Sequence, residues 1–387
     1  MSILNTTSTF FITEVNTVDQ ERVFLEMTDK IYKNDPYFVR PLDKDIKAVF
    51  DIEQNPLLRQ EQGKCRRWLL WTDSGSCIGR IAAFYKVKSG AGQQRRTGAI
   101  GFFECINDQE AANLLFDQAK RWLASEAIKV IHGPVNFGSR HRWWGLLVDG
   151  QALANYSCNY HPVYYRNLFE DYGFVLNYRQ LTFSLSQQDP QPRLLKQLLE
   201  HFKADSRYTF KQVNPHLELD AAVEFQELYN KTWSVQEGLP PMSLDQVLSL
   251  TRQLEEVLDP RLIWFAYYNG QPVAFFVGIP ELNRLIVQHV NGKINFMDRF
   301  KLASRKWLGQ YEKAYGLYYG VLPEFQRRGV GLGLIASMQD AWANRLKIPY
   351  KEIEFGWIGD YNPRAVKLMK TIGGEISKVH HTYRLWI

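Results

Sequence analysis

The residues with the clearest chemical potential in this sequence run from Gln326 to Gly331, in the order Gln-Arg-Arg-Gly-Val-Gly. They follow Tyr315–Val321, which reads as a strand, and precede a helical pattern that ends near Lys347. The two glycines remove side chains where a backbone must approach a ligand, and the first amides of the following helix point there. The two arginines add positive charge beside those amides. The pattern therefore predicts a site for a diphosphate.

This hexapeptide resembles the Q/R-x-x-G-x-G/A signature of the GNAT N-acyltransferases, and the preceding Val321–Phe325 resembles the strand exit and turn typical of that family. In that family the loop holds the pyrophosphate of coenzyme A. The resemblance implies that an acyl-CoA, used as co-substrate, contacts Gly320, Val321, Gln326, Arg327, Arg328, Gly329, Val330, Gly331, Leu332 and Gly333. The alternative interpretation is an ordinary glycine-rich turn before a helix.

A second element of the resemblance is Asn362–Gly373, which is similar to the Asn-x-x-Ala helix of the family, ending at glycine. The strand expected before it, Lys351–Trp357, splays in this fold from its neighbour and opens a space for the pantetheine arm. The resemblance therefore implies that Asn362 and Ala365 face the cofactor.

The sequence departs from the family where a proton donor is expected. Many members place a tyrosine four residues after that alanine, where it protonates the leaving thiolate, but this sequence has Met369. Methionine cannot donate that proton. Tyr318, Tyr319 and Tyr361 are alternative donors, water is another, and loss of the chemistry is a further alternative. For each tyrosine, packing against the core is the competing interpretation.

A general base is also needed, because an amine acceptor must lose a proton during acyl transfer. Glu354 and His289 are the titratable residues nearest the expected site by their sequence placement, and each is equally a candidate surface or packing residue. The resemblance implies that backbone N–H groups around Gly320 and Val321 contact the thioester oxygen and the pantetheine. The predicted catalytic set is Tyr318, Tyr319 and Glu354.

The first half of the sequence contains an irregular polar and aromatic loop, Gly133–Gly150, with a glycine at each end. A loop of this length and composition is held either against its own domain or against a substrate. The candidate substrate contacts are Asn136, Arg140, His141, Trp143 and Trp144. Structural packing is the competing interpretation.

Together with Ile31–Leu42, Asn159–Tyr165 and Pro280–Asn283, this loop resembles a bacterial two-domain GNAT group. That group includes proteins similar to bacterial ceramide synthases, which attach a fatty acyl group from acyl-CoA to the amine of a sphingoid base. The resemblance implies a small-molecule or lipid amine as acceptor and no metal. Two alternatives remain: a catalytically silent acyl-CoA-binding or regulatory protein, and an enzyme similar to aminoacyl transferases.

The elements that must position these residues recur in the two halves of the sequence, which indicates an internal duplication. Each half has a hairpin, Arg67–Tyr85 in the first and Leu262–Ile279 in the second. Each half then has a short helix closed by a glycine, Gly173 or Gly373, and a final strand. Two unrelated α+β domains with chance similarities are the alternative.

We therefore expect an α/β fold of tandem GNAT-like domains, 1–188 and 189–387, each a mixed, mostly antiparallel sheet flanked by helices. In the first domain the helix that corresponds to the diphosphate site begins at Asn107–Glu110, which has no glycine and two acids. Those acids would repel a pyrophosphate. Only the second domain is expected to bind acyl-CoA.

Composition limits the remaining function classes. The 387 residues exceed the size at which one core stops growing, and the net charge of +6 is too small and dispersed for a nucleic-acid footprint. No apolar run approaches the ~20 residues that cross a bilayer, and the polar N-terminus does not read as a secretory signal. We expect a cytoplasmic protein with, at most, peripheral membrane association. The four cysteines lack disulfide or zinc spacing: Cys65, Cys77, Cys105 and Cys158.

Overall fold

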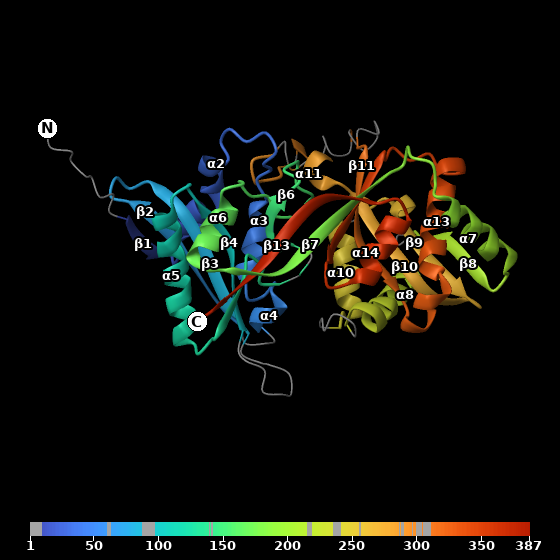
Figure 1. The fold of residues 1–387 in the computed structure, drawn as a ribbon, viewed down its shortest axis with the longest axis horizontal. Coiled ribbons are helices and arrows are strands. Elements are labelled where there is room, and N and C mark those ends of the chain that lie inside the picture. The colour runs from blue at the N-terminus through green and yellow to red at the C-terminus, as the bar shows by residue number, and fades with distance from the viewer. Residues whose placement is uncertain are drawn as a thin grey trace. The chain divides into compact units, whose positions relative to one another are not determined.

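The computed structural model describes residues 10–59, 63–86, 97–138, 140, 142–214, 219–234, 241–254, 257–285, 287, 290–295, 297–298, 304 and 311–387. Its contacts divide the chain into two units (Figure 1). Unit 1 comprises Met1–Leu181, Val287–Asn295 and Lys378–Ile387, and unit 2 comprises Thr182–Ile286 and Phe296–Ser377. In the described parts of the chain, no helix combines the length and apolar character needed to span a bilayer.

The first half of the chain alternates strands with helices. Its strands are β1 (Phe10–Glu14), β2 (Lys64–Thr72), β3 (Cys77–Tyr85), β4 (Thr97–Cys105), β5 (Val130–Gly133), β6 (Leu146–Asp149) and β7 (Val175–Ser186). Its helices are α1 (Val18–Glu26), α2 (Thr28–Ile31), α3 (Asp43–Phe50), α4 (Pro56–Arg59), α5 (Gln109–Ser125) and α6 (Tyr165–Tyr172).

The second half follows the same order. Its strands are β8 (Tyr208–Gln212), β9 (Ile263–Tyr268), β10 (Gln271–Pro280), β11 (Lys313–Val321), β12 (Glu352–Gly359) and β13 (Glu375–Trp386). Its α-helices are α7 (Arg193–Ala204), α8 (Leu219–Tyr229), α10 (Leu244–Leu254), α11 (Leu282–Leu285), α13 (Val330–Asn344) and α14 (Pro363–Thr371). Short helices of other types are η1 (Asn230–Ser234), η2 (Pro260–Leu262) and η4 (Pro323–Arg328).

The predicted hairpins are confirmed. β2 and β3 pair antiparallel and turn through Gly75, whose φ is 77°. β9 and β10 also pair antiparallel and turn at Asn269 and Gly270, whose φ values are 48° and 77°. Asparagine and glycine tolerate this left-handed conformation, which matches the twist of a two-residue hairpin.

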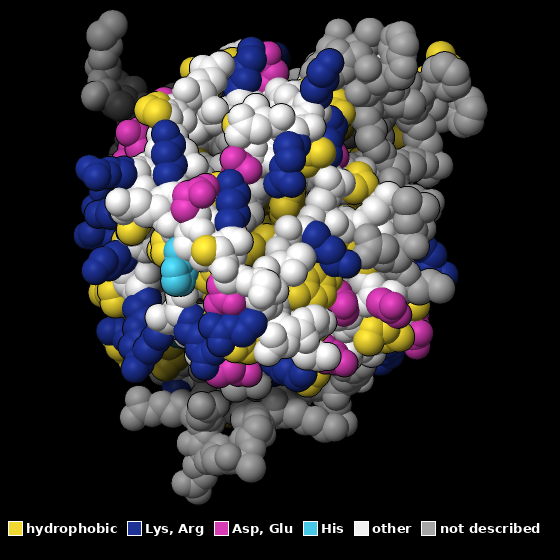
Figure 2. Space-filling model, turned by 90° about the vertical axis from the view of Figure 1, so that its right-hand side faces the viewer, with side chains coloured by type: hydrophobic (Ala, Val, Ile, Leu, Met, Phe, Trp, Pro, Cys, Tyr) yellow, Lys and Arg dark blue, Asp and Glu magenta, His cyan; other side chains and the backbone are white. Residues whose placement is uncertain are grey.

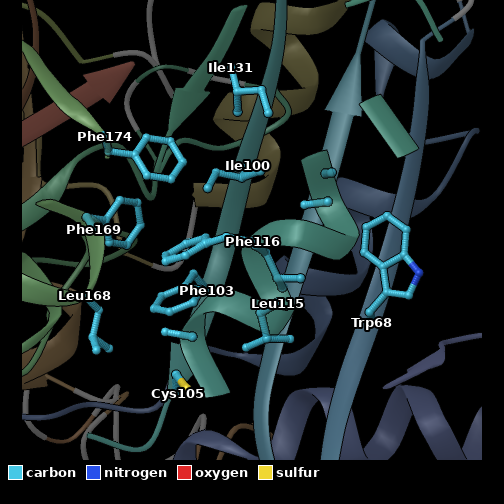
Figure 3. Close-up of a cluster of buried hydrophobic side chains, with 14 of the residues drawn as sticks. Trp68, Ile100, Phe103, Cys105, Leu115, Phe116, Ile131, Leu168, Phe169 and Phe174 are labelled. Atoms are coloured by element: carbon cyan, nitrogen blue, oxygen red, sulfur yellow. The ribbon is translucent and has the colours of Figure 1, made fainter. Parts of the chain in front are cut away.

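The sheet of unit 1 is covered on both faces because its strands alternate apolar side chains between the two sides. On one side Trp68 and Leu70 pack with α5 and α6 in a cluster that contains Phe103, Phe116 and Phe169 (Figure 3). On the other side Leu69 packs in a cluster with residues of α1 and α3. Nine of the 23 buried residues of the first cluster are aromatic, which explains part of the high aromatic content of the sequence.

The final strand of each sequence half crosses into the other unit. In unit 1 the strand order is β1-β2-β3-β4-β5-β13, and β13 pairs antiparallel with both β5 and β6. In unit 2 the order is β7-β12-β11-β10-β9-β8. Unit 1 therefore receives residues 378–386 from the end of the second half, and unit 2 receives Thr182–Ser186 from β7. This exchange of strands differs from the expected division into residues 1–188 and 189–387.

Candidate functional site

Among the residues that the structure describes, no side chain caps the backbone amides at the start of α13. Gly329 is the N-cap residue, with φ 73°, and makes no side-chain hydrogen bond to the helix. The first bond of the helix runs from the N–H of Gly333 to the carbonyl of Gly329, at 2.9 Å. The amides of Val330, Gly331 and Leu332 precede that bond and lie at the positive end of the helix dipole. This geometry fits an anion.

The turn η4 places basic side chains immediately before those amides. Gln326 is anchored, because its Nε2 donates to the carbonyl of Val321 at 3.2 Å. Arg327 and Arg328 are exposed, and the guanidinium of Arg328 lies 4.9 Å from the ring centre of Phe325. Exposed guanidinium groups beside free amides suit the two linked phosphates of a diphosphate.

Next to this turn, strands β11 and β12 cease to pair. Their parallel register runs from Lys313 opposite Glu352 to Gly316 opposite Phe355. β11 continues to Val321 and β12 continues to Gly359 outside that register. Beyond Gly316 the register between β11 and β12 ends in the described part of the chain, so this edge of β11 is a candidate contact for an extended ligand that leads away from the start of α13.

A β-bulge lies at the point where the pairing ends. On the other side of β11, Tyr318 is opposite Val277 and Gly316 is opposite Gly278, so that Leu317 has no opposite residue in β10. Bulges redirect backbone groups and are common next to active sites. Leu317 is a candidate backbone contact that the sequence analysis missed, and only the adjacent glycine signals it.

The predicted tyrosines lie on opposite faces of β11. Tyr318 faces α8, where its ring centre is 5.9 Å from that of Phe225 and 5.8 Å from that of Tyr229. Burial, together with the neighbouring Tyr318, raises the pKa of Tyr229 to about 12. Phe225 and Tyr229 have the i, i+4 spacing of one helix face, which is the signal in the sequence for this contact of α8 with Tyr318.

Tyr319 faces α13 instead. A Cβ atom added to Gly331 would lie 1.9 Å from the Tyr319 hydroxyl and 3.0 Å from Cγ2 of Val321. Burial raises the pKa of Tyr319, so its hydroxyl is neutral at physiological pH. Tyr319 therefore lies under the first turn of the helix that carries the free amides.

Glu354 is buried and ion-paired. Its carboxylate lies 3.1 Å from Nζ of Lys313, and the side chains are 2% and 5% exposed, respectively. Glu354 is opposite Tyr315, within the paired part of β11 and β12. The other predicted base, His289, lies outside the described residues.

The α14 residues have local structural partners. Asn362 is the N-cap, and its side chain accepts a hydrogen bond from the N–H of Ala365 at 3.2 Å. Met369 is a residue of α14 and is 3% exposed, so its side chain lies on the buried side of that helix. Tyr361 is 52% exposed at the end of β12. The position at which the family carries a tyrosine is thus occupied by a buried thioether.

Two predicted cofactor glycines are required by packing. A Cβ on Gly333 would lie 2.6 Å from the ring of Phe202. A Cβ on Gly320 would lie 2.4 Å from the ring of Phe275 and 2.9 Å from Oγ1 of Thr232. These glycines allow α7 to pack closely on α13 and allow η1 to pack closely on β11.

In unit 1 the predicted substrate residues lie in the 133–150 loop. Trp143 is 6% exposed and packs against Phe102, with ring centres 5.5 Å apart. Asn136 is also buried, at 4% exposure. Trp144 donates from Nε1 to the hydroxyl of Tyr178 at 2.8 Å, and the Arg140 guanidinium lies 5.6 Å from the Trp144 ring. His141 lies outside the described residues. The loop also contains β6, whereas we expected it to be irregular.

The loop fills the space beside β4 that corresponds to the unpaired edge of β11. The parallel pairing of β4 and β5 ends at Ala99 opposite His132, and β4 also contains a bulge, at Phe102, whose φ is 50°. After β5 ends at Gly133, the N–H of Val135 donates to the carbonyl of Ile100 in β4 at 2.8 Å. A Cβ on Gly101 would lie 2.0 Å from the carbonyl oxygen of Val135. The chain itself therefore occupies this edge in unit 1.

The helix that corresponds to α13 is capped by an acid. The Asp108 side chain accepts a hydrogen bond from the N–H of Ala111 at 2.9 Å at the start of α5. A carboxylate at this position satisfies an amide and neutralises the dipole that would attract an anion.

Charged side chains and possible metal-binding side chains are the remaining features of the described residues that could mark a site. Figure 2 shows Lys and Arg side chains spread over one end of unit 2 with Asp and Glu among them. Within the described residues, no group of three or more His, Cys, Asp or Glu side chains is arranged to hold a metal ion.

The chain is similar in sequence to known proteins. Residues 222–373 match the model of the acetyltransferase (GNAT) family. The chain is 24% identical over 380 residues to Protein YghO of Escherichia coli (strain K12), covering 94% of this chain and 92% of that protein. It is 22% identical over 382 residues to a bacterial ceramide synthase of Caulobacter vibrioides (strain NA1000 / CB15N), covering 98% of each. The resemblance predicted from the loop is thus confirmed.

The fold is likewise shared with solved structures. A tandem GNAT protein from the clavulanic acid biosynthesis pathway superposes with a TM-score of 0.54 at 11% identity, covering 98% of each chain. The tandem GNAT-like α/β fold predicted from the duplicated sequence is confirmed.

Proposed function

We propose, from the premise that residues 222–373 match the acetyltransferase (GNAT) family, that this protein is an acyl-CoA-dependent N-acyltransferase that acts on an amine. The observation that carries the proposal is the start of α13, where a glycine N-cap leaves the first amides uncapped beside the exposed Arg327 and Arg328. These groups would hold the diphosphate. The unpaired edge of β11 would hold the pantetheine arm by backbone hydrogen bonds.

In the proposed reaction the amine nitrogen attacks the thioester carbonyl carbon. The new C–N bond forms, the C–S bond breaks, the nitrogen loses a proton and the departing thiolate gains one. Backbone N–H groups between Leu317 and Val321 would stabilise the negative charge on the thioester oxygen. Tyr318 is the proposed proton donor because it adjoins the bulged residue Leu317 and lies just beyond the part of β11 that pairs with β12. Asn362 and Ala365 would support the start of α14 beside β12.

We propose a lipid amine of the sphingoid-base type as the acceptor class. The support is the full-length similarity to a protein named bacterial ceramide synthase, at 22% identity. The same similarity makes a fatty acyl-CoA the first donor to test. We further propose that one acyl-CoA binds per chain, in the domain 189–387, because Asp108 caps the corresponding helix of the domain 1–188.

The test is to incubate the protein with short-chain and long-chain acyl-CoAs and a sphingoid base, and to detect the amide by mass spectrometry and the free thiol by a colorimetric reagent. Gly329→Asp combined with Gly331→Asp should abolish coenzyme A binding by charge and steric clash at the amides. Gly270→Asp is the matched control: it makes the same change at a left-handed glycine of unit 2 that has no neighbour within 4 Å.

The outcomes separate the parts of the proposal. Coenzyme A binding that survives the double aspartate variant contradicts the α13 site. Amide formation with other amines but not with the sphingoid base removes the lipid acceptor and leaves the acyl transfer. Tyr318→Phe should lower kcat without changing the dissociation constant of coenzyme A if Tyr318 donates the proton.

One observation favours a second candidate, a catalytically silent acyl-CoA-binding protein. Met369, which cannot donate a proton, is buried where the family carries its tyrosine. Tight coenzyme A binding without thiol release across a panel of amines and sphingoid bases would support this alternative.

A further inference from the structure

The first turn of α13 rests on a side chain from β11. The position of a Cβ on Gly331 is 1.9 Å from the hydroxyl of Tyr319 and 3.1 Å from Cζ of the same ring. Atoms that are not bonded do not approach to 1.9 Å, so the hydroxyl can occupy its place only because residue 331 has no side chain. Gly331 is therefore explained by a contact within the protein as well as by the approach of a ligand.

The side chain beneath the turn is itself held in place by the sheet. Tyr319 lies opposite Phe276 in the antiparallel register of β10 and β11, so the backbone that carries it is paired. Val321, two residues further along the same face, also contacts the Gly331 position, at 3.0 Å. The height of the turn above the sheet is thus set by a rigid ring on a paired strand.

We propose that Tyr319 is a positioning residue, whose hydroxyl, seated against Gly331, fixes the α13 amides that bind the diphosphate of acyl-CoA. This inference rests on the proposed function. It replaces a catalytic role for Tyr319, because a hydroxyl beneath the helix faces away from the α8 side of the strand, where Tyr318 lies. Burial keeps the phenol neutral, so it brings no negative charge close to the diphosphate.

A double-mutant cycle tests the contact. Gly331→Ala places a methyl group against the Tyr319 hydroxyl and should weaken coenzyme A binding by about tenfold, which is about 1.4 kcal/mol. Tyr319→Phe removes only the hydroxyl and should weaken binding by about threefold, since the turn loses its support. In the double variant the contact at 1.9 Å is gone and the nearest neighbours of the methyl group are at 3.0 and 3.1 Å, so the double variant should bind more tightly than Gly331→Ala alone. The dissociation constant of coenzyme A is measured by isothermal titration calorimetry.

A second double-mutant cycle uses Gly333, the next glycine of α13 at which a Cβ would clash with a neighbour. It controls for a general disturbance of α13 by any added methyl group. The atoms nearest to a Cβ on Gly333 belong to Phe202 and Phe210. Tyr319→Phe should therefore change the effect of Gly331→Ala but not the effect of Gly333→Ala. Thermal denaturation of each variant without ligand checks that it folds. If Gly331→Ala alone does not fold, recovery of folding and of coenzyme A binding in the double variant Gly331→Ala, Tyr319→Phe supports the contact, and no recovery contradicts it.

Steady-state kinetics separate positioning from proton donation. With the amine and acyl-CoA that give product, Tyr319→Phe should raise the KM for acyl-CoA and leave kcat unchanged, whereas loss of a proton donor would lower kcat. Independent, additive effects of Tyr319→Phe and Gly331→Ala on coenzyme A binding, or a fall in kcat alone, would overturn the inference. If the unmodified protein does not bind coenzyme A at all, the proposed function fails instead.

Discussion

Two ionisable side chains illustrate how burial fixes the charge of individual residues in this protein. Glu354 is buried with a cation, Lys313, whereas His161 is buried without charge. A buried charge needs its partner, and a buried neutral histidine resists protonation. Both residues are therefore sensitive to changes that leave a charge without compensation.

Removing the cation from the Lys313–Glu354 pair should destabilise unit 2. Lys313→Met leaves the Glu354 carboxylate buried without this counter-charge, and the free energy of unfolding in urea should fall by about 3–5 kcal/mol. The double variant Lys313→Met, Glu354→Gln should recover much of that loss. If the double variant is no more stable than the single one, the ion pair is not the origin of the effect.

Stability should fall in acid because of His161. Its Nδ1 accepts a hydrogen bond from the N–H of Leu147 at 3.1 Å, and burial, with a smaller contribution from His380, lowers its pKa to about 3. An exposed histidine titrates near about 6.5, so between these values the unfolded chain binds the additional proton. The contribution is fully present above pH ~6.5 and is lost as the pH falls, by about 2 kcal/mol at pH ~5.

The measurement is the free energy of unfolding between neutral pH and pH ~5, compared with that of His161→Gln. Glutamine keeps an acceptor for the Leu147 amide but does not titrate. An identical pH dependence in the two proteins would exclude His161 as the cause.

At the scale of elements, two corresponding helices begin in opposite ways. α5 starts with an aspartate cap, whereas α13 starts with a glycine that leaves its amides uncapped. The same fold position therefore carries a stabilising side-chain cap in unit 1, and in unit 2 it is the anion site that we propose.

Asp108→Ala should remove only the stabilising cap. The expected loss is about 1 kcal/mol in the free energy of unfolding, because the Ala111 amide loses its acceptor. The dissociation constant of coenzyme A should not change. A large change in that constant would indicate that unit 1 takes part in binding.

The sequence was most informative where local chemistry determines the element. Residues Asn269 and Gly270 predict their turn because few residues adopt positive φ, and Gln326–Gly331 predicts the α13 loop for the same reason. The bulges at Phe102 and Leu317 could not be predicted, because they depend on the register between distant strands. The contact between Tyr319 and Gly331 likewise requires the crossing of β11 and α13 to be known.

At the scale of the whole molecule, the predicted division at residue 188 and the contact-based units differ in their treatment of the last strands. β13 contributes Tyr383, which is fully buried, to the core of unit 1, whereas Ile376 at its start is 46% exposed in unit 2. Both halves of the sequence have the pattern of a closing strand. Alternation of apolar residues specifies which face of a strand is buried but not which sheet receives it.

The shared strand leads to a paired prediction. Tyr383→Ala should destabilise unit 1 by about 3–5 kcal/mol, because it removes a large buried ring. Its hydroxyl also donates to Glu170 at 2.9 Å. Ile376→Ala in the same strand should change stability by less than about 0.5 kcal/mol.

Hydrogen exchange followed by mass spectrometry locates the effect of each substitution. In Tyr383→Ala the amides of β5 and α6 should lose protection. Equal loss of protection throughout both units would show that the units unfold together.

Because residues 378–386 complete the sheet that begins with β1, the order of synthesis matters for this protein. When the first half leaves the ribosome, β13 has not yet been translated, and the edge of β5 that pairs with it lacks this partner until residues 378–386 have emerged. Chaperone dependence during translation, and sensitivity to nonsense codons close to residue 378, follow from where this one strand lies.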